Sequence, residues 1–253
     1  MRFFGILAAS TAMLAVPALA QAEDNSARQV IEAAIAAHGG DVWLDPGTLV
    51  MSGHATFYAP DKAEPVSTTD DYRMWRTINT DRKQAHGAEG KVRIRAASGE
   101  RLVFEVGFDG ETTWNQNGIV PKDEADKFWA SNFGFGIIRR ALDEGFTLEA
   151  APARDIEGHE LDLVRIVDPG GAKTLFGIDR DSRFIRYMAF NSPRGLHERI
   201  YDDFVKYPDS GWVQAREVTL YYDGVRNNTV YWTDVKVGAQ IPEETYAPPP
   251  ADR

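Results

Sequence analysis

The amino-acid sequence predicts a mainly β protein with few helices, in which about a dozen strands form an antiparallel meander. Apolar and polar residues alternate with period two along many segments, as in strands with one buried face and one wet face. Short turn sequences separate these segments, so consecutive strands are expected to pair as hairpins. Only two segments have helical features, one near the N-terminus and one in mid-chain. No low-complexity linker or charge block divides the chain, which favours a single domain.

The first helix is expected over residues 26–38. Apolar residues recur there at helical spacing from Ala27 to Ile35, behind Asn25-Ser26 as a candidate cap. Gly39 suits the left-handed position that follows a helix. His38 lies at the helix end, where a cation would be stabilised by the helix dipole.

Strands are expected wherever the alternation persists. In the segment from Leu49 to Tyr58, apolar residues occupy one face and polar residues the other. The same pattern returns at 91–96 and 101–108. Further strand-like runs lie at 146–151, 160–168, 172–178, 184–190, 196–206, 213–222 and 228–237. The turns between them are expected at Ser98-Gly99, Asp109-Gly110, Asn117-Gly118, 168–171, 179–183, 209–211 and Asp223-Gly224.

The mid-chain helical segment opens at Pro121, with acidic residues in its first turn. Residues 131–136 are poor helix formers, so two short helical pieces with a flexible apolar joint are expected. Glycines on both sides of Phe135 would let this joint move at low cost. Segment 128–138 is therefore a candidate lid over an apolar interior.

Composition excludes several classes of protein. The chain has 253 residues, of which 43% are hydrophobic, which is too many for a disordered protein. It has no Cys, so disulfides, Cys-based zinc sites and thiol catalysis are all excluded. Lys and Arg total 28 against 38 Asp and Glu, a net charge of −10 that argues against nucleic acid as a partner.

Residues 1–22 have the features of a secretory signal peptide. Arg2 precedes an apolar run to Val16, and Ala18-Leu19-Ala20 provides the small residues that signal peptidase reads. We therefore expect an exported protein, periplasmic if the source is Gram-negative, without stable membrane insertion after cleavage. Residues 23–245 would form the domain and residues 246–253 a loose tail.

No segment carries a recognised catalytic or metal-binding motif. The five histidines are not spaced as metal ligands, and a structural or solvent-exposed role is expected for each (His38, His54, His86, His159 and His197). The carboxylate pairs Asp70-Asp71 and Asp202-Asp203 join strand neighbours, whose side chains point to opposite faces. We therefore expect no enzymatic activity, no metal and no cofactor.

Aromatic residues recur along the predicted sheet and through the helical insertion. They could fill an ordinary core, or they could line an apolar cavity inside a curled sheet, and the sequence leaves both interpretations open. In the second case the candidate ligand contacts are Trp75, Phe104, Trp114, Trp129, Phe133 and Phe135.

Several segments of the chain resemble the LolA-like family of periplasmic lipoprotein carriers. The likeness lies in the end of the first helix at 36–40, the strand-turn-strand at 176–186, the hairpin from Tyr201-Asp202-Asp203-Phe204 to Gly211-Trp212-Val213, and the ending at 235–242 with Tyr246-Ala247-Pro248. Together they extend over most of the chain after the signal peptide.

The resemblance implies an open, curved half-barrel of about 11–12 antiparallel strands whose concave apolar face is covered by helices and binds acyl chains. The protein would then carry a lipid or an acylated protein and could contact other envelope proteins. This chain is longer than the usual carrier. Because it lacks the Cys that lipidation needs, it does not match the membrane-anchored receptor branch. No gating residue of the family is matched to a position here.

Three functions are compatible with these observations. The first is a non-enzymatic carrier that holds its ligand in the half-barrel. The second is an envelope-stress sensor or partner-binding module on the same fold. The third is a secreted hydrolase that uses His and Asp residues brought together by folding.

Overall fold

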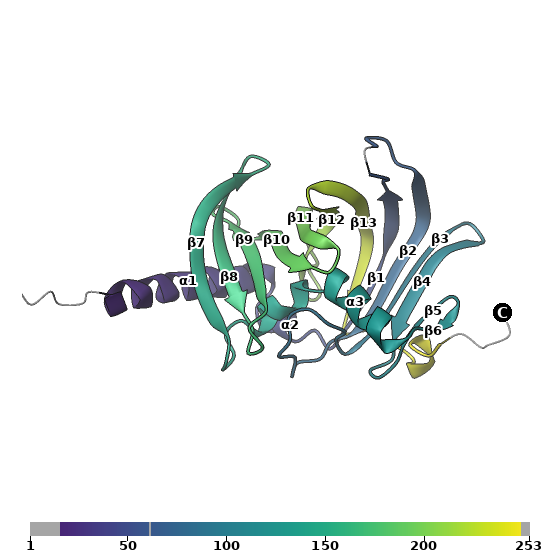
Figure 1. Cartoon of the computed structure of the whole chain (residues 1–253), viewed down its shortest axis with the longest axis horizontal. Coiled ribbons are helices and arrows are strands. Elements are labelled where there is room, and N and C mark those ends of the chain that lie inside the picture. The colour runs from purple at the N-terminus through teal and green to yellow at the C-terminus, as the bar shows by residue number, and fades with distance from the viewer. Residues whose placement is uncertain (1–15, 61, 249–253) are drawn as a thin grey trace, which may run out of the picture.

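A computed structural model describes residues 16–60 and 62–248, with side chains described from Ser26 onward (Figure 1). Most of the predicted signal peptide lies outside the described residues. Its last part, residues 16–22, forms the first turns of a helix that continues to His38. No helix in the described part of the chain is both long enough and apolar enough to cross a membrane.

The first half of the chain starts with two helices and continues with six strands. The helices are α1 (Val16–His38) and α2 (Asp41–Leu44), and the strands are β1 (Thr48–Phe57), β2 (Ser67–Thr77), β3 (Lys91–Ser98), β4 (Arg101–Phe108), β5 (Thr113–Asn115) and β6 (Gly118–Ile119). The sequence patterns do not single out β2, because Asp70, Asp71 and Arg73 interrupt its apolar alternation.

The second half starts with the helical insertion and continues with seven strands. The insertion consists of α3 (Lys122–Asn132) and the 3₁₀ helix η1 (Phe135–Arg140), which confirms the expected two helical pieces. The strands are β7 (Thr147–Ile156), β8 (His159–Val167), β9 (Lys173–Asp179), β10 (Ile185–Ser192), β11 (Gly195–Lys206), β12 (Val213–Tyr222) and β13 (Val225–Val237), followed by the 3₁₀ helix η2 (Glu243–Thr245).

In the described residues, all thirteen strands form one antiparallel sheet in the order β6-β5-β4-β3-β2-β1-β13-β12-β11-β10-β9-β8-β7. The first and last strands lie side by side at its centre, where Leu49 pairs with Val237. The chain therefore builds one wing outward from β1, crosses by α3 and η1 to the far edge at β7, and returns strand by strand. The sheet is curved and not closed, which confirms the predicted half-barrel with a helical insertion (Figure 1).

The predicted turns lie between consecutive strands. Asp223 and Gly224 connect β12 to β13 with φ values of 50° and 74°. A two-residue hairpin turn with both φ angles positive matches the twist of the strands, which is why an Asp-Gly pair occurs here. At the turn between β9 and β10, Asp179 Oδ1 accepts hydrogen bonds from the backbone N–H groups of Asp181 and Ser182, which confirms a charged hairpin turn.

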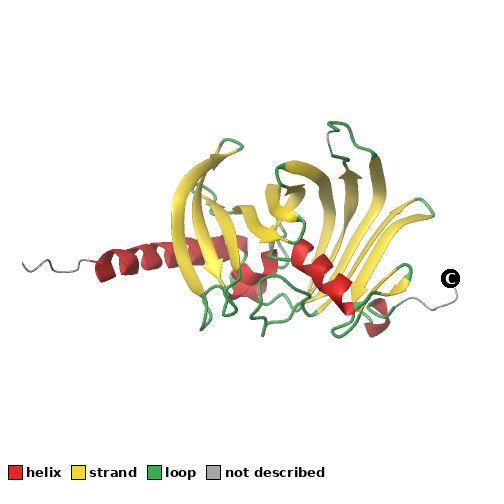
Figure 2. Cartoon of the chain, viewed as in Figure 1, coloured by secondary structure: helices red, strands yellow, loops and turns green. Residues whose placement is uncertain are grey.

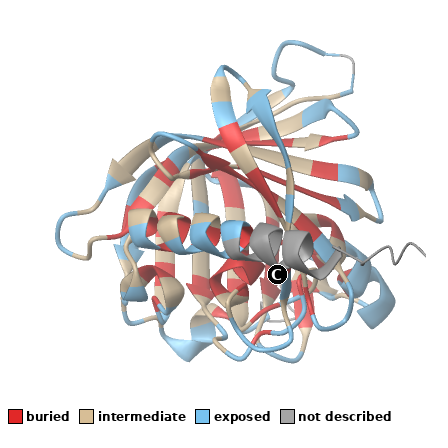
Figure 3. Cartoon of the chain, turned by 90° about the vertical axis from the view of Figure 1, so that its left-hand side faces the viewer, coloured by how far each residue is buried: buried red, intermediate tan, exposed pale blue. Residues whose placement is uncertain are grey.

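The helices α1, α2 and α3 and the 3₁₀ helix η1 lie on the concave side of the sheet (Figure 2). The face of α1 that carries Ile31, Ala34 and Ile35 is buried against β7, β8 and β9, and Figure 3 shows buried parts of the strands behind this helix. The helix α3 covers the opposite wing through Trp129, which packs with Val92 and other side chains of the sheet. One wing of the half-barrel is thus filled by α1, and the other is covered by the insertion.

The C-terminal segment packs on the convex side of β2 to β5. Tyr246 has only 1% of its surface exposed, its hydroxyl lies 3.0 Å from Thr77 Oγ1, and its carbonyl oxygen accepts a 2.7 Å hydrogen bond from Trp114 Nε1. Packing of the chain therefore extends through Tyr246, one residue beyond the expected end of the domain.

Candidate functional site

An apolar cavity of about 380 Å³ lies between the concave face of the sheet and the helical insertion. Its size falls in the range of roughly 300–1,000 Å³ typical of small-molecule sites. Its walls come from both wings and from the insertion, and the apolar lining residues include Leu49, Met51, Phe57, Met74, Ile94, Phe104, Phe133, Phe135, Val218, Leu220, Val230 and Trp232. Both interpretations of the aromatic residues therefore apply. Some aromatic side chains fill a core beneath α1, and others line a cavity.

The alternation of the strands decides which of the predicted contacts reach the cavity. On β2, Tyr72, Met74 and Arg76 line it, so Trp75 points to the convex face. There the guanidinium carbon of Arg93 lies 5.4 Å from the ring centre of Trp75 and 5.7 Å from that of Trp114. Trp75 and Trp114 are therefore placed outside the cavity, which corrects their assignment as cavity residues.

The burial of Trp114 has a cause that the local sequence does not reveal. The C-terminal segment lies over it, and its indole N–H bonds to the carbonyl of Tyr246. A segment 132 residues away supplies an apolar cover on the convex face, so an aromatic side chain can be buried there without facing the half-barrel.

Trp129 lies on the concave side but does not line the cavity. It is 1% exposed, and its Nε1 donates a 2.8 Å hydrogen bond to Thr113 Oγ1. Its ring packs edge to face on Phe108 and Phe133, with ring centres 6.1 and 4.8 Å apart. The residue therefore fastens α3 to the sheet, and its prediction as a ligand contact is corrected to a structural role.

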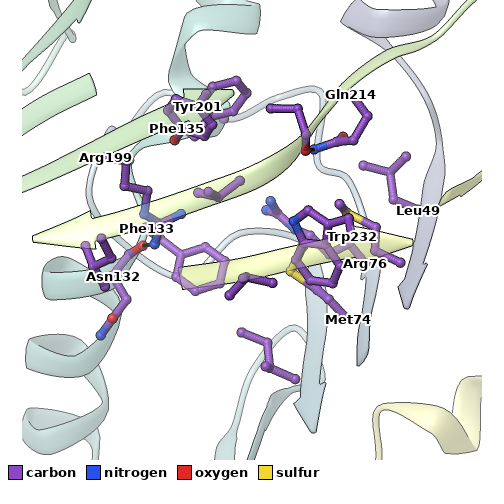
Figure 4. A pocket seen from close by; sticks show the side chains of 18 of the residues that line it. Leu49, Met74, Arg76, Asn132, Phe133, Phe135, Arg199, Tyr201, Gln214 and Trp232 are labelled. Carbon is purple, nitrogen blue, oxygen red and sulfur yellow. Dashed lines mark hydrogen bonds between the residues drawn. The ribbon is translucent and has the colours of Figure 1, made fainter. Parts of the chain in front are cut away.

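The remaining three predicted contacts do line the cavity. Phe104 comes from β4. Phe133 follows α3 and Phe135 begins η1, and Figure 4 labels both in the cavity. The ring of Phe135 lies 5.0 Å from that of Tyr201 on β11. These residues bring one strand and the insertion together around the same apolar space.

The two glycines of the joint have a steric role. A Cβ at Gly134 would lie 2.7 Å from the ring of Phe190, and a Cβ at Gly136 would lie 2.7 Å from Glu89 Oε2. Neither residue has a positive φ angle. The expected flexible joint is therefore, in this arrangement, a close-packed one in which only glycine fits.

Three arginines that the sequence analysis did not select also line the cavity: Arg76, Arg139 and Arg199. The described lining residues include no carboxylate. For Arg76 and Arg199, strand alternation could have indicated a place in the cavity. Arg76 shares a face of β2 with Met74, and Arg199 shares a face of β11 with Tyr201. Charged residues in an alternating strand ordinarily face solvent, so the period-two pattern does not single out these arginines.

Arg139 is held by a backbone carbonyl and by aromatic rings. Its Nε donates a 2.8 Å hydrogen bond to the carbonyl of Trp43, and its guanidinium carbon lies 4.6 Å from the Trp43 ring centre and 5.5 Å from that of Trp212. Burial lowers the pKa of Arg139 to about 10, so it remains charged at neutral pH. Its function here is to join η1 to α2 and the floor of the cavity.

A buried carboxylate behind the cavity balances part of this charge. Glu89, in the β2–β3 loop, accepts a 2.8 Å hydrogen bond from Arg76 Nη2 and a second from Arg82 Nη1. Burial alone would raise the pKa of Glu89, but the charges of Arg76, Arg82 and Arg139 outweigh it and hold the pKa below its usual range. The loop thus carries an ionised carboxylate that anchors Arg76.

His38 is the histidine that lines the cavity, and both of its ring nitrogens have partners. Its Nε2 accepts a 3.0 Å hydrogen bond from the N–H of Ile185, and its Nδ1 faces the carbonyl of Val213 at 3.4 Å. Burial lowers the pKa of His38 to about 4. The ring is therefore neutral, and the expected cation at the end of α1 is corrected to a neutral link between α1 and the sheet.

Two further histidines form a stack away from the cavity lining. The ring of Phe190 lies between those of His86 and His197, at 4.1 and 4.4 Å. His197 donates from Nδ1 to the carbonyl of Ser131 at 2.8 Å. Across the described residues, no group of three or more His, Cys, Asp or Glu side chains is arranged to hold a metal ion.

No protein-family model matches the chain, and no curated protein matches it by sequence. Among solved structures, a LolA superfamily protein from Nitrosomonas europaea covers 87% of this chain and 97% of its own length, with a TM-score of 0.54 and 13% identity. A domain from Vibrio parahaemolyticus, named for outer membrane lipoprotein sorting, has the same coverage, a TM-score of 0.50 and 11% identity. A DUF1329 family protein from Desulfovibrio piger also scores 0.50, at 7% identity. At these identities the likeness concerns the fold.

Proposed function

Because this chain has the LolA-like fold, we propose that it is a non-enzymatic carrier that binds a lipid or a lipid-modified protein by enclosing an acyl chain in the half-barrel. The observation that carries the proposal is the apolar cavity between the curved sheet and the insertion. A carrier of this kind needs such a space, because an acyl chain taken out of a bilayer stays out of water only if an apolar protein surface encloses it.

The energetics of burial are sufficient for this function. Each buried CH₂ group contributes about 0.8 kcal/mol, so ten methylenes would contribute about 8 kcal/mol before the entropy of association is subtracted. Phe104, Phe133 and Phe135 supply aromatic walls for the chain, and Trp232 forms part of the opposite wall. No catalytic group is required for affinity of this kind.

The segment 128–138 is proposed as the lid through which the ligand passes. Four hydrogen bonds tie its central residues to the sheet. The carbonyl of Ser131 accepts from Tyr222 and His197, the carbonyl of Asn132 accepts from Arg199, and Asn132 Oδ1 accepts from Tyr222. Opening would break these polar contacts, release the buried Trp129 from Thr113 and expose the cavity. The rest of the sheet could remain unchanged, because its strands are paired with one another.

Binding without chemical transformation is favoured by the bonding of His38, which lines the cavity. His38, the cavity residue best suited to act as a general base, has both ring nitrogens bonded to backbone groups. A neutral imidazole with a pKa near 4 that is held on both sides has no free position for a substrate proton. An exported location, based on the signal-like residues 1–22, completes the proposal and would expose the carrier to lipid-modified proteins of the cell envelope.

The proposal is tested by identifying lipids that copurify with the protein after expression with export. We expect organic extraction and mass spectrometry to detect an acyl-chain lipid in the wild-type protein. Val218→Trp places a large ring in the cavity and should abolish copurification, whereas Val225→Trp, at the exposed first residue of β13, should not. Equal lipid retention by both folded variants, or none in the wild type, would contradict the assignment.

A further inference from the structure

We propose that the ligand carries an anionic headgroup, a carboxylate or a phosphate, which Arg199, Arg76 and Tyr201 bind inside the cavity. This inference rests on the proposed function and names the class of lipid that the cavity would hold. It starts from the charge of the lining, where three guanidinium groups are present and the described residues contribute no carboxylate.

Arg199 and Arg76 each use part of their hydrogen-bonding capacity and leave part unused. Arg199 Nη2 donates to the carbonyl of Asn132 at 2.7 Å, and Arg76 Nη2 donates to Glu89 at 2.8 Å. The Nε atoms of both arginines are buried and have no hydrogen-bond partner. A buried N–H without a partner costs free energy that a bound oxygen would recover.

A third polar atom with the same property is the hydroxyl of Tyr201. Tyr201 is 6% exposed, and its Oη is buried without a hydrogen-bond partner. Burial raises the pKa of Tyr201 to about 12, so at neutral pH the hydroxyl keeps its proton and can donate a hydrogen bond to an anion. Tyr201 follows Arg199 by two positions on β11, which places both side chains on the concave face.

The two arginines converge on the same part of the lid. The guanidinium carbon of Arg76 lies 5.3 Å from the centre of the Phe133 ring, and Arg199 bonds to the preceding residue, Asn132. Figure 4 shows both side chains reaching into the cavity from different strands, with Phe133 close to them. A headgroup held there would lie beside the lid, while its chain extends over the apolar floor.

The chemistry of these groups favours an anion over a neutral headgroup. Arginine binds carboxylate and phosphate through charge-assisted hydrogen bonds that are stronger than those to a neutral oxygen. Glu89 offsets Arg76 and Arg82 from behind, but Arg199 has no carboxylate among its contacts in the described structure. Arg139 differs from these two arginines because its Nε donates to the carbonyl of Trp43 and its guanidinium carbon lies 4.6 Å from the centre of the Trp43 ring.

The test compares three ligands with the same chain and different headgroups: hexadecanoate, hexadecyl phosphate and hexadecanol. Binding to the delipidated full-length protein at pH 7.5 is followed by tryptophan fluorescence, since Trp43 and Trp232 line the cavity. We expect at least one of the two anions to bind about tenfold more tightly than the alcohol, as a hydrogen bond to a charged group implies. The anion that binds more tightly identifies the headgroup.

The variants Arg199→Gln and Tyr201→Phe should each lower the ratio of anion affinity to hexadecanol affinity several-fold. Arg199→Lys keeps the charge and should retain part of the preference, which separates charge from packing. The matched control is Arg73→Gln on β2, whose side chain is half exposed and paired with Asp71 on the convex face. It should behave as the wild type.

The outcomes are distinguishable. Equal affinity for all three ligands, or an anion preference that survives in folded Arg199→Gln and Tyr201→Phe, would overturn the anionic headgroup while leaving the carrier function supported. Failure of all three ligands to bind would contradict the proposed function and this inference with it.

Discussion

Trp129 Nε1 donates a 2.8 Å hydrogen bond to Thr113 Oγ1, and this contact fastens α3 to strand β5. The indole is almost completely buried between the helix and the sheet. Because α3 and the joint that follows it form one wall of the cavity, this single side chain sets the position of the proposed lid.

Replacing Trp129 with Ala should detach α3 without unfolding the sheet. Loss of a buried Trp side chain costs about 3–5 kcal/mol, and here the loss should be confined largely to residues 122–136. Hydrogen exchange of backbone amides in α3 measures this directly. Lys127→Ala, on the exposed side of the same helix, is the control. Unchanged exchange of α3 in Trp129→Ala would show that other contacts hold the helix.

The buried histidines should make the protein less stable in mild acid. Burial, the larger cause, and the charge of Arg199 lower the pKa of His197 to about 2, and burial lowers that of His38 to about 4, against 6.5 for the free side chain. Below about pH 6.5 the unfolded chain binds protons at these rings while the folded chain does not. Stability is therefore complete above this pH and falls as the pH drops toward the folded pKa values, by about 2 kcal/mol per ring at pH 5.

Urea unfolding at pH 7.5 and pH 5 tests this pH dependence. His197→Phe removes one titrating ring and keeps an aromatic side chain against Phe190, so the difference between the two pH values should shrink by about 2 kcal/mol. His54→Phe changes an exposed histidine and leaves the buried rings in place. The same pH difference in wild type and His197→Phe would refute the role of His197.

Glu89→Gln should destabilise the fold strongly. The substitution removes the carboxylate that pairs with Arg76 and Arg82 and leaves their charges uncompensated in a buried site. Breaking a buried ion pair from one side costs about 3–5 kcal/mol. Chemical denaturation measures the loss, with the exposed Glu111→Gln as control. A change below about 1 kcal/mol would mean that solvent screens this cluster as it does a surface pair.

Tyr246, which follows η2, should matter for stability and not for ligand binding. Tyr246→Ala uncovers Trp114 on the convex face and should cost about 3 kcal/mol. Tyr246→Phe removes only the contact to Thr77 and should cost about 1 kcal/mol.

Hexadecanoate affinity should stay unchanged in both Tyr246 variants, because the residue lies on the face opposite the cavity. A weakened affinity in Tyr246→Phe would show that the two faces are coupled. Glu244→Ala, nearby and exposed, is the control.

The sequence by itself determined the local structure of this protein. Period-two alternation and turn pairs such as Asp223-Gly224 identify hairpins, because strand geometry and turn angles depend on neighbouring residues. The end of α1 at His38 and the two pieces of the insertion follow from local preferences in the same way. Strand β2 is the exception, since Asp71 and Arg73 form ion pairs on its convex face and hide the apolar pattern.

The tertiary structure alone decided which side of each strand faces the cavity and what covers the other side. Alternation places Met74 and Trp75 on opposite faces, but it does not say which face is concave, and both faces here have an apolar cover. Tyr246 reaches Trp114 from far along the chain. Arg76 lies against Phe133 and Arg199 bonds to its neighbour Asn132, although 123 positions in sequence separate the two arginines. Such contacts depend on the pairing of β1 with β13 and on the curvature of the sheet, which no local pattern encodes.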